Sequence, residues 1–150
     1  MGYFNIPMSG FSKGPKNQPD FRINHIRIAP FICYEIAFPN EVLNSAEKSE
    51  MLVTVSDDSW FGRSIALAEH LQMARMRSLE TGRTQLLSTN TGITAFISPF
   101  GTILKGAPID ERLVLTDTVY PMTGKTPLMR WGYYPVMGVV MLMVLYALIL

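Results

Sequence analysis

The sequence predicts a layered α/β domain followed by one membrane-spanning helix. Short apolar runs rich in β-branched residues alternate with segments of helical periodicity, which is typical of a layered α/β fold. The final stretch, residues 131–150, contains no charged residue. Of the 150 residues, 48% are hydrophobic and 17% are charged, which excludes a disordered chain and allows one domain with a core.

The first half of the chain reads as an irregular connection followed by strand, helix and strand. Residues 1–20 are rich in Pro, Gly, Ser and Asn and predict the connection. Residues 25–35 (HIRIAPFICYE) predict an extended run entering a buried strand, and residues 39–48 have helix-compatible composition. The apolar run MLVTVS, residues 51–56, predicts the next strand. This spacing fits a βαβ unit.

A loop, DDSWFG, leads into an amphipathic helix predicted over residues 65–83. Gly82 supplies its C-terminal stop. Four residues repeat at helical spacing on one face: Leu67, Leu71, Ala74 and Ser78.

The second half is strand-rich and shows no internal repeat. Strands are predicted at residues 85–90, 92–98 and 101–106, and the turn SPFG joins the last two. Alternation of apolar and polar residues predicts a further half-buried strand over residues 112–119.

Residues 131–150 predict a transmembrane helix, because twenty residues rising about 1.5 Å each cover roughly 30 Å, the thickness of a hydrocarbon core. Trp131, Tyr133 and Tyr134 lie at its start, where aromatic rings favour the membrane interface, and Arg130 lies just outside. The alternative is a buried core helix, which seldom lacks polar positions for five turns.

Three parts are therefore expected: a domain over residues 1–118, a linker rich in Pro and Gly over residues 119–130, and the membrane helix.

Charge and metal-binding residue types exclude several classes of function. A net charge of +1 with no basic run gives no indication of nucleic-acid binding. His25 and His70 are far apart in the sequence, so no metal site is predicted, and no cofactor is expected.

Cys33, the only cysteine, is the candidate nucleophile. A lone cysteine on an apolar strand is often an inert buried residue. Here the strand gives way to helix-forming residues, and a helix N-terminus favours the thiolate. The backbone N–H of Tyr34 is a candidate oxyanion donor, whereas its ring is expected in the core. Glu35 would point to the same side as Cys33 if the strand continued; the alternative is an exposed acid starting a helix.

Other polar residues have plain structural interpretations. Asp57 and Asp58 resemble an acid/base pair, but adjacent side chains in a loop usually diverge, so both are expected to be solvated. The segment with Ser88, Asn90 and Gly92 lies between strands and is expected to form a turn, with a place near the substrate as the alternative.

Four ordered blocks carry a resemblance to a known family. ICYE, then TVSDDSWFG, then AEHLQMARMRSLETGR, then STNTGITAFISPFG resemble the apolipoprotein N-acyltransferases, the membrane branch of the nitrilase superfamily. The segment PMSGFSKG near the start is also similar to the family pattern. Together these blocks span about two thirds of the chain.

The resemblance implies part of a nitrilase-type αββα sandwich and a two-step acyl transfer. Cys33 would take an acyl chain from a phospholipid as a thioester and pass it to the α-amino group of a diacylglyceryl-cysteine apolipoprotein. The resemblance also implies that Glu35 belongs to the active site and that Trp60 and Phe61 lie beside it, where an acyl chain could pack; ordinary packing against the sheet is the alternative. It assigns catalysis to Glu and Lys, so His70 is expected to be a structural hydrogen-bonder. Arg75 and Glu80 are expected to tie their helix to neighbouring strands.

The family triad also contains a Glu and a Lys that precede the cysteine strand. No glutamate precedes Cys33, and Lys13 and Lys16 lie in a segment similar to a later part of the family pattern, so neither is assigned. The chain is therefore expected to be a C-terminal fragment. A nitrilase-type amidase and a catalytically inactive membrane-tethered module are the alternative functions. The resemblance implies the bacterial inner membrane as the location, with the domain on the periplasmic side, and the sequence predicts no oligomeric state.

Overall fold

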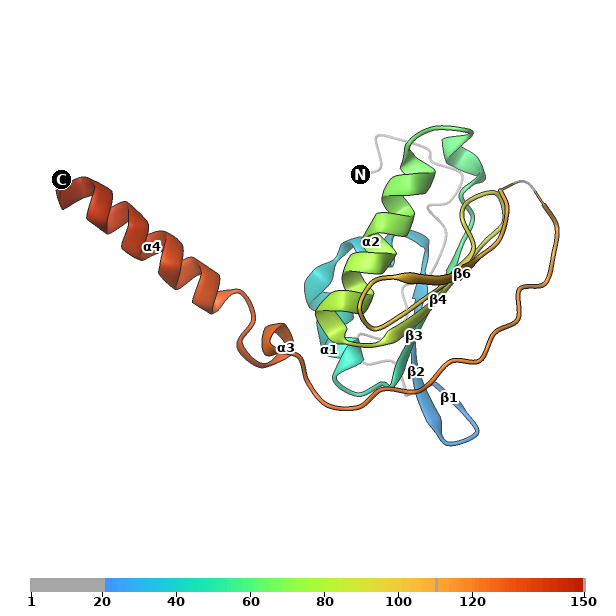
Figure 1. Ribbon diagram of the computed structural model, residues 1–150, viewed down its shortest axis with the longest axis horizontal. Helices are drawn as coiled ribbons and strands as arrows, with labels where there is room; N and C mark the ends of the chain where they lie inside the picture. Colours follow the sequence, from blue (N-terminus) through green and yellow to red (C-terminus); the bar gives the residue numbers. More distant parts are fainter. Residues whose placement is uncertain (1–20, 110, 150) are drawn as a thin grey trace, which may run out of the picture.

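The computed structural model describes residues 21–109 and 111–149 and contains one six-stranded sheet with strand order β1-β2-β3-β4-β5-β6 (Figure 1). The predicted connection over residues 1–20, with Lys13 and Lys16, lies outside the described residues. The strands are β1 (Phe21–Ile23), β2 (Ile26–Ile32), β3 (Met51–Ser56), β4 (Thr84–Thr89), β5 (Ala95–Ile97) and β6 (Ile103–Gly106).

The three central strands are parallel and end together. Ile32 pairs with Val55, and Val55 pairs with Ser88, so the carboxyl ends of β2, β3 and β4 meet at one edge of the sheet. The outer pairs β1–β2, β4–β5 and β5–β6 are antiparallel. The loops that leave the three parallel strands are consequently brought side by side.

Two helices cover one face of this sheet: α1 (Pro39–Ala46) and α2 (Ala66–Thr81) (Figure 1). Each lies in a crossover between neighbouring parallel strands. Right-handed crossovers added in the same direction along a sheet put both helices on the same face. Two short 3₁₀ helices, η1 (Cys33–Ala37) and η2 (Ser59–Phe61), begin the crossovers at the carboxyl edge.

The core lies between this face and the two helices. It consists of Ala29, Phe31, Ile36, Val42, Ala46, Leu52, Leu71, Ala74, Leu87, Ala95, Ile97 and Met129. The predicted face of α2 is confirmed, since Leu67, Leu71, Ala74 and Ser78 are all buried. Gly82 ends the helix in the left-handed conformation at φ 62°, as its stop role requires.

The opposite face of the sheet is apolar and partly open. Ile32 exposes 66% of its surface and Val55 exposes 49%, and the two are direct neighbours across β2 and β3. Pro30 lies on this face as well, beyond the last residue of β2 that β1 pairs with, Ile28. A proline fits there because β2 has a neighbour on only one side at that point among the described strands.

The strand predicted over residues 112–119 is wrong. This stretch has no strand assignment and runs past β6 as an extended segment (Figure 1). Side-chain donors, and not a backbone ladder, attach this stretch and the residue after it to the sheet. Lys105 donates to the carbonyl oxygen of Thr116 at 2.7 Å, and Thr84 donates to that of Tyr120 at 3.1 Å. The alternation of apolar and polar residues therefore belongs to an extended segment that lies beside the sheet and forms no strand of it.

The segment predicted as a linker, residues 119–130, is closely attached to the domain. It contains most of a short helix, α3 (Pro127–Trp131), whose Met129 packs in the core. The Thr126 hydroxyl donates to the carbonyl oxygen of Glu80 at 2.6 Å and also caps α3. Attachment therefore continues up to the start of the final helix.

The final helix, α4 (Tyr134–Ile149), extends away from the sheet domain (Figure 1). Its residues are exposed and apolar over nearly their whole length. Among the described residues, no helix combines the length and the apolar character that crossing a membrane requires.

Buried Arg83 joins three separate parts of the chain at the amino edge of β4. Its Nε donates to Ser49 O at 2.9 Å, and its Nη2 donates to Gly124 O at 2.7 Å and to Ala46 O at 3.4 Å. Burial lowers the pKa of the Arg83 guanidinium from its ordinary value. The three carbonyl groups would lose their donor if this side chain were removed.

Replacing Arg83 by methionine is expected to lower the free energy of unfolding by about 2–4 kcal/mol, because buried carbonyl groups lose charge-assisted hydrogen bonds. Thermal unfolding of the longest natural polypeptide that carries this segment measures the effect. Arg112→Met is the matched control, because Arg112 is exposed. Equal melting temperatures for the two variants would contradict the role of Arg83.

Candidate active site

Cys33 lies at the carboxyl end of β2, where the chain turns sharply into η1. Its backbone is in the left-handed region at φ 52°, which few residues other than glycine adopt. Strained conformations of this kind persist only where the surrounding structure imposes them, and they cluster at functional sites. Cys33 is half-buried. The strand end therefore presents a thiol on a tight turn at the edge where three loops meet.

Glu35 does not continue the strand, so the condition for pointing to the same side as Cys33 is not met, and it is an exposed acid in the first turn of a helix, which was the alternative. The strand ends at Ile32, and Glu35 is the third residue of η1. Its carboxylate accepts a hydrogen bond from the backbone N–H of Ile32 at 2.7 Å, one residue before the cysteine. A capping interaction of this type satisfies an N–H at the start of a helix, and here it braces the turn that carries Cys33.

The ring of Tyr34 was expected in the core, and this expectation is wrong: Tyr34 exposes 47% of its surface. It stacks on the ring of His70, with centroids 6.2 Å apart and an interplanar angle of 10°. Its other neighbour is Phe61, at a centroid distance of 5.9 Å. The ring therefore forms a surface between the Cys33 turn and the loop after β3.

Asp58 is buried with 1% of its surface exposed, so the expectation that both loop carboxylates are solvated is wrong for this residue. Its Oδ1 accepts a hydrogen bond from the Ser56 hydroxyl at 2.6 Å, and its backbone N–H donates to the side-chain oxygen of Asn90 at 3.0 Å. A Cβ at Gly92 would overlap the carboxylate, so this glycine allows the close approach of the loop after β4.

Asp57, by contrast, faces solvent, as predicted. Hydrogen bonds from the side chain and backbone of Ser59 and from the amide of Asn90 hold the pKa of Asp57 below its ordinary value. The two adjacent carboxylates thus diverge, and only one of them enters the interior.

His70 connects the buried carboxylate to the cysteine turn. Its Nδ1 lies 3.1 Å and 3.2 Å from the two carboxylate oxygens of Asp58, and its Nε2 lies 3.3 Å from the backbone carbonyl oxygen of Cys33. The side chain is buried, with 3% of the residue exposed. His70 therefore makes structural hydrogen bonds, as predicted, and the acceptor of one of them is the nucleophile's own peptide group.

Sequence reasoning missed the connection between Asp58 and His70. The signal available was their separation of 12 residues across a loop and the first turn of a helix. That separation alone does not show whether the two residues approach each other.

Trp60 and Phe61 lie in η2 at the same edge as Cys33. Trp60 is 75% exposed, and Phe61 is half-buried against Tyr34. A shallow hollow of about 500 Å³ opens on the carboxyl ends of the parallel strands, and neither Trp60 nor Phe61 is among its described lining residues. It is lined by Ile32, Val55, Ser56, Asp57, Ser88, Thr89 and Asn90.

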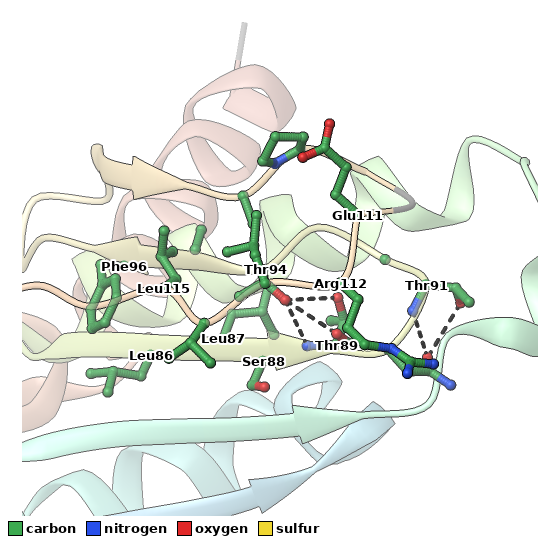
Figure 2. A pocket seen from close by; sticks show the side chains of 17 residues that line it. Leu86, Leu87, Ser88, Thr89, Thr91, Thr94, Phe96, Glu111, Arg112 and Leu115 are labelled. Carbon is green, nitrogen blue, oxygen red and sulfur yellow. Dashed lines mark hydrogen bonds between the residues drawn. The ribbon is translucent and has the colours of Figure 1, made fainter.

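A second cavity, of about 790 Å³, lies between β4, β5 and the extended segment that follows β6 (Figure 2). Figure 2 shows Leu86 and Phe96 on the strands facing Leu115 of that segment. Its described lining residues include none from the Cys33 turn, and it meets the hollow at Ser88, Thr89 and Asn90. The residue before Cys33, Ile32, lines the smaller hollow, so we place the candidate site at the Cys33 turn, next to that hollow.

Arg75 and Glu80 were both predicted to tie α2 to neighbouring strands, and of the two only the Arg75 side chain contacts the sheet region among the described residues. Arg75 donates to the carbonyl oxygen of Gly101, in the turn between β5 and β6, at 2.7 Å. Glu80 instead forms an ion pair with Arg77 in the same helix at 2.6 Å. Burial raises the pKa of Glu80, and the Arg77 charge opposes this effect.

No three His, Cys, Asp or Glu side chains in residues 21–109 and 111–149 come together in a way that could hold a metal ion. The candidate site consists instead of a thiol, backbone N–H groups, a buried carboxylate–imidazole pair and an apolar surface. This set of groups suits attack on an acyl carbonyl group.

Comparison with solved structures places the fold. An amidase from Nesterenkonia sp. aligns with a TM-score of 0.53 and 17% identity, over 67% of this chain and 40% of the amidase. Saccharomyces cerevisiae Nit3, a member of the nitrilase superfamily, aligns with a TM-score of 0.54 and 19% identity over 67% of this chain and 40% of Nit3. At these identities the likeness concerns the mixed α/β nitrilase-type fold.

Curated relatives are closer in sequence. The apolipoprotein N-acyltransferase of Coxiella burnetii is 57% identical over 97% of this chain, and that of Azotobacter vinelandii is 45% identical over 99%. The chain spans only 30% and 29% of the length of these two relatives. Residues 5–127 match the model of the carbon-nitrogen hydrolase family. Because that match covers most of the sequence, the chain belongs to the carbon-nitrogen hydrolase family.

Proposed function

We propose that this chain supplies the nucleophile-bearing part of an apolipoprotein N-acyltransferase. The observation that carries the proposal is the position of Cys33, on a strained turn at the carboxyl end of a parallel strand, in a chain 41–57% identical to relatives of that name. The proposed activity belongs to the whole enzyme. The curated relatives are more than three times as long as this segment.

The proposed reaction has two steps. The Cys33 thiolate attacks the ester carbonyl carbon of a phospholipid, and collapse of the tetrahedral oxyanion forms a thioester and expels the lysophospholipid alkoxide, which takes up a proton. The α-amino group of a diacylglyceryl-cysteine apolipoprotein then attacks the thioester carbonyl, forming an amide, releasing the thiolate and losing one proton. A covalent intermediate divides one difficult transfer into two easier ones.

The groups around Cys33 have separate roles in this proposal. The backbone N–H of Tyr34 lies in the first turn of η1, where N–H groups have no partner within the helix, and it donates to the oxyanion. Glu35 holds the turn through the N–H of Ile32. The Glu and Lys that the family resemblance implies as base and oxyanion stabiliser are supplied from outside this sequence.

The apolar outer face of the sheet supports a two-sheet sandwich. We propose that this face, with Ile32 and Val55 exposed on it, packs against a second sheet supplied by polypeptide outside the described residues, giving the αββα arrangement. Packed sheets lie about 10 Å apart with interdigitated apolar side chains. The second sheet would also cover part of the larger cavity over β4 and β5.

Trp60 and Phe61 are proposed to contact the acyl chain of the donor. Their rings lie at the edge that carries Cys33, and Trp60 exposes 75% of its surface, which makes a large apolar ring accessible there. An exposed aromatic ring beside a reactive group is a typical contact for an apolar substrate.

Residues 131–150 are proposed to lie in the bacterial inner membrane, with residues 1–118 as the domain on its periplasmic side. The support is the apolar surface of α4, its extension away from the domain and the aromatic cluster at its start (Figure 1). Residues 119–130 then connect the domain to the membrane segment.

The first test is covalent labelling. The longest natural polypeptide carrying this segment, incubated with phospholipid labelled in its acyl chain, is expected to form a hydroxylamine-sensitive adduct that Cys33→Ser abolishes, because Cys33 is the proposed acyl acceptor. An adduct that persists undiminished in Cys33→Ser would exclude Cys33 as the acyl carrier. Release of free fatty acid with an apolipoprotein acceptor present would favour the hydrolase alternative.

The second test concerns chain length. Trp60→Ala is expected to lower kcat/KM for a hexadecanoyl donor roughly tenfold relative to a butanoyl donor, because only the long chain loses apolar contact with the ring. Trp131→Ala is the matched control, since Trp131 is also exposed but lies beside α4. Equal losses for both donors would argue against acyl-chain contact.

The third test concerns membrane insertion. Val140→Lys is expected to disfavour insertion of residues 131–150 by about 3 kcal/mol, whereas the same change at Tyr133, near the expected interface, is expected to cost much less. Glycosylation mapping of the segment in a reporter protein measures the inserted fraction. Similar fractions for the two variants would contradict the membrane assignment.

A further inference from the structure

His70 is the residue whose place in the structure the proposed function leaves unexplained. It is buried on α2, yet its Nε2 reaches across to the carbonyl oxygen of Cys33 at 3.3 Å, on a different element. The thiol itself is not among its hydrogen-bond partners in the described structure. Whatever His70 does for the nucleophile, it does through the peptide group that joins Cys33 to Tyr34.

Because that peptide group is planar, one hydrogen bond to its carbonyl oxygen also fixes the direction of its N–H. In a planar trans peptide, the carbonyl oxygen of one residue and the N–H of the next point in opposite directions. Holding the Cys33 carbonyl toward His70 therefore directs the Tyr34 N–H away from His70. If this peptide plane rotated, the N–H would turn with it, and its direction as a donor would be lost.

The left-handed backbone of Cys33 makes such a restraint necessary. A residue other than glycine at φ 52° is held there against its intrinsic preference. Two contacts restrain this turn from either side of Cys33. Glu35 binds the preceding N–H, of Ile32, and His70 binds the following carbonyl.

The orientation of His70 is itself fixed by Asp58. Nδ1 of the ring faces the Asp58 carboxylate at 3.1 Å, and Nε2 faces the carbonyl oxygen of Cys33 at 3.3 Å, so the two contacts together fix the plane of the ring. Asp58 is held in turn by the Ser56 hydroxyl, by Asn90 and by the close approach of Gly92. The Tyr34 ring stacks on the imidazole and covers it.

We infer that His70, oriented by Asp58, is a positioning residue that locks the peptide between Cys33 and Tyr34 so that the Tyr34 N–H serves as an oxyanion donor. This inference rests on the proposed function for the role of Cys33 as an acyl acceptor. It assigns His70 neither proton transfer with the thiol nor contact with the substrate.

The test separates stabilisation of an oxyanion from reactivity of the thiol. Attack of the Cys33 thiolate on p-nitrophenyl butanoate passes through an oxyanion, which collapses to the thioester and expels p-nitrophenolate. Alkylation by iodoacetamide displaces iodide from carbon and forms no oxyanion. Both rates are measured on the longest natural polypeptide carrying this segment, with the background of Cys33→Ser subtracted.

His70→Phe retains a ring that can stack on Tyr34 but removes both ring nitrogens and their contacts with Asp58 and the carbonyl oxygen of Cys33. It is expected to slow acylation by the ester about 100-fold, the size of effect seen when one oxyanion donor is lost, and to change alkylation by less than about threefold. Asp58→Asn is expected to change the ratio of the two rates in the same direction by a smaller factor. Glu69→Gln, an exposed neighbour on α2, is the matched control and is expected to leave both rates unchanged.

Two results would overturn the inference: both rates unchanged in His70→Phe, or both reduced by the same factor. Thermal unfolding of each variant identifies a folding defect, and Asp58→Asn supplies the decision if His70→Phe does not fold. The proposed function fails separately, if the wild-type protein forms no adduct with phospholipid. The ratio of ester acylation to alkylation still decides the role of His70 in that case.

Discussion

The buried carboxylate of Asp58 constrains the geometry of the whole site. A buried carboxylate is costly unless it is hydrogen-bonded, and here the Ser56 hydroxyl at the end of β3 and the His70 ring on α2 contact it. The backbone N–H of Asp58 donates in addition to Asn90 in the loop after β4. Because β2, β3 and β4 end in register, the loops leaving them are close enough for Asp58 to contact Asn90 directly and Cys33 through His70. Satisfying Asp58 therefore fixes the surroundings of Cys33 as well.

Most of the secondary structure followed from the sequence because each element carries a local signal. The run at residues 51–56 became β3 with the same bounds, and the helix predicted over residues 65–83 became α2, Ala66–Thr81. The failure at residues 112–119 has a physical cause, since alternation reports which side chains face the protein and does not show whether a backbone ladder forms. The tight attachment of residues 119–130 was also hidden, because it depends on carbonyl groups that meet Arg83 and Thr126.

The site was less predictable than the fold, because its contacts join residues distant in sequence. The position of Cys33 at a strand end was predicted, but its left-handed backbone was not, since no glycine or asparagine marks the turn. For Glu35 two placements were open, and the structure has the second, an exposed acid at the start of a helix, because the strand ends at Ile32 and a 3₁₀ turn follows. Burial of Asp58 requires a glycine at position 92, because a Cβ there would overlap the carboxylate. The sequence does not show that these two loops are in contact.

The order of the strands has a consequence for how the domain forms. Strands that are neighbours in the described sheet are also neighbours in the sequence, but the parallel pairs β2–β3 and β3–β4 close only across the crossovers that contain α1 and α2. Closing a long crossover costs more chain entropy than closing a hairpin, and parallel pairings of this kind form slowly. The edge that carries Cys33 is therefore complete only once β2, β3 and α2 have assembled.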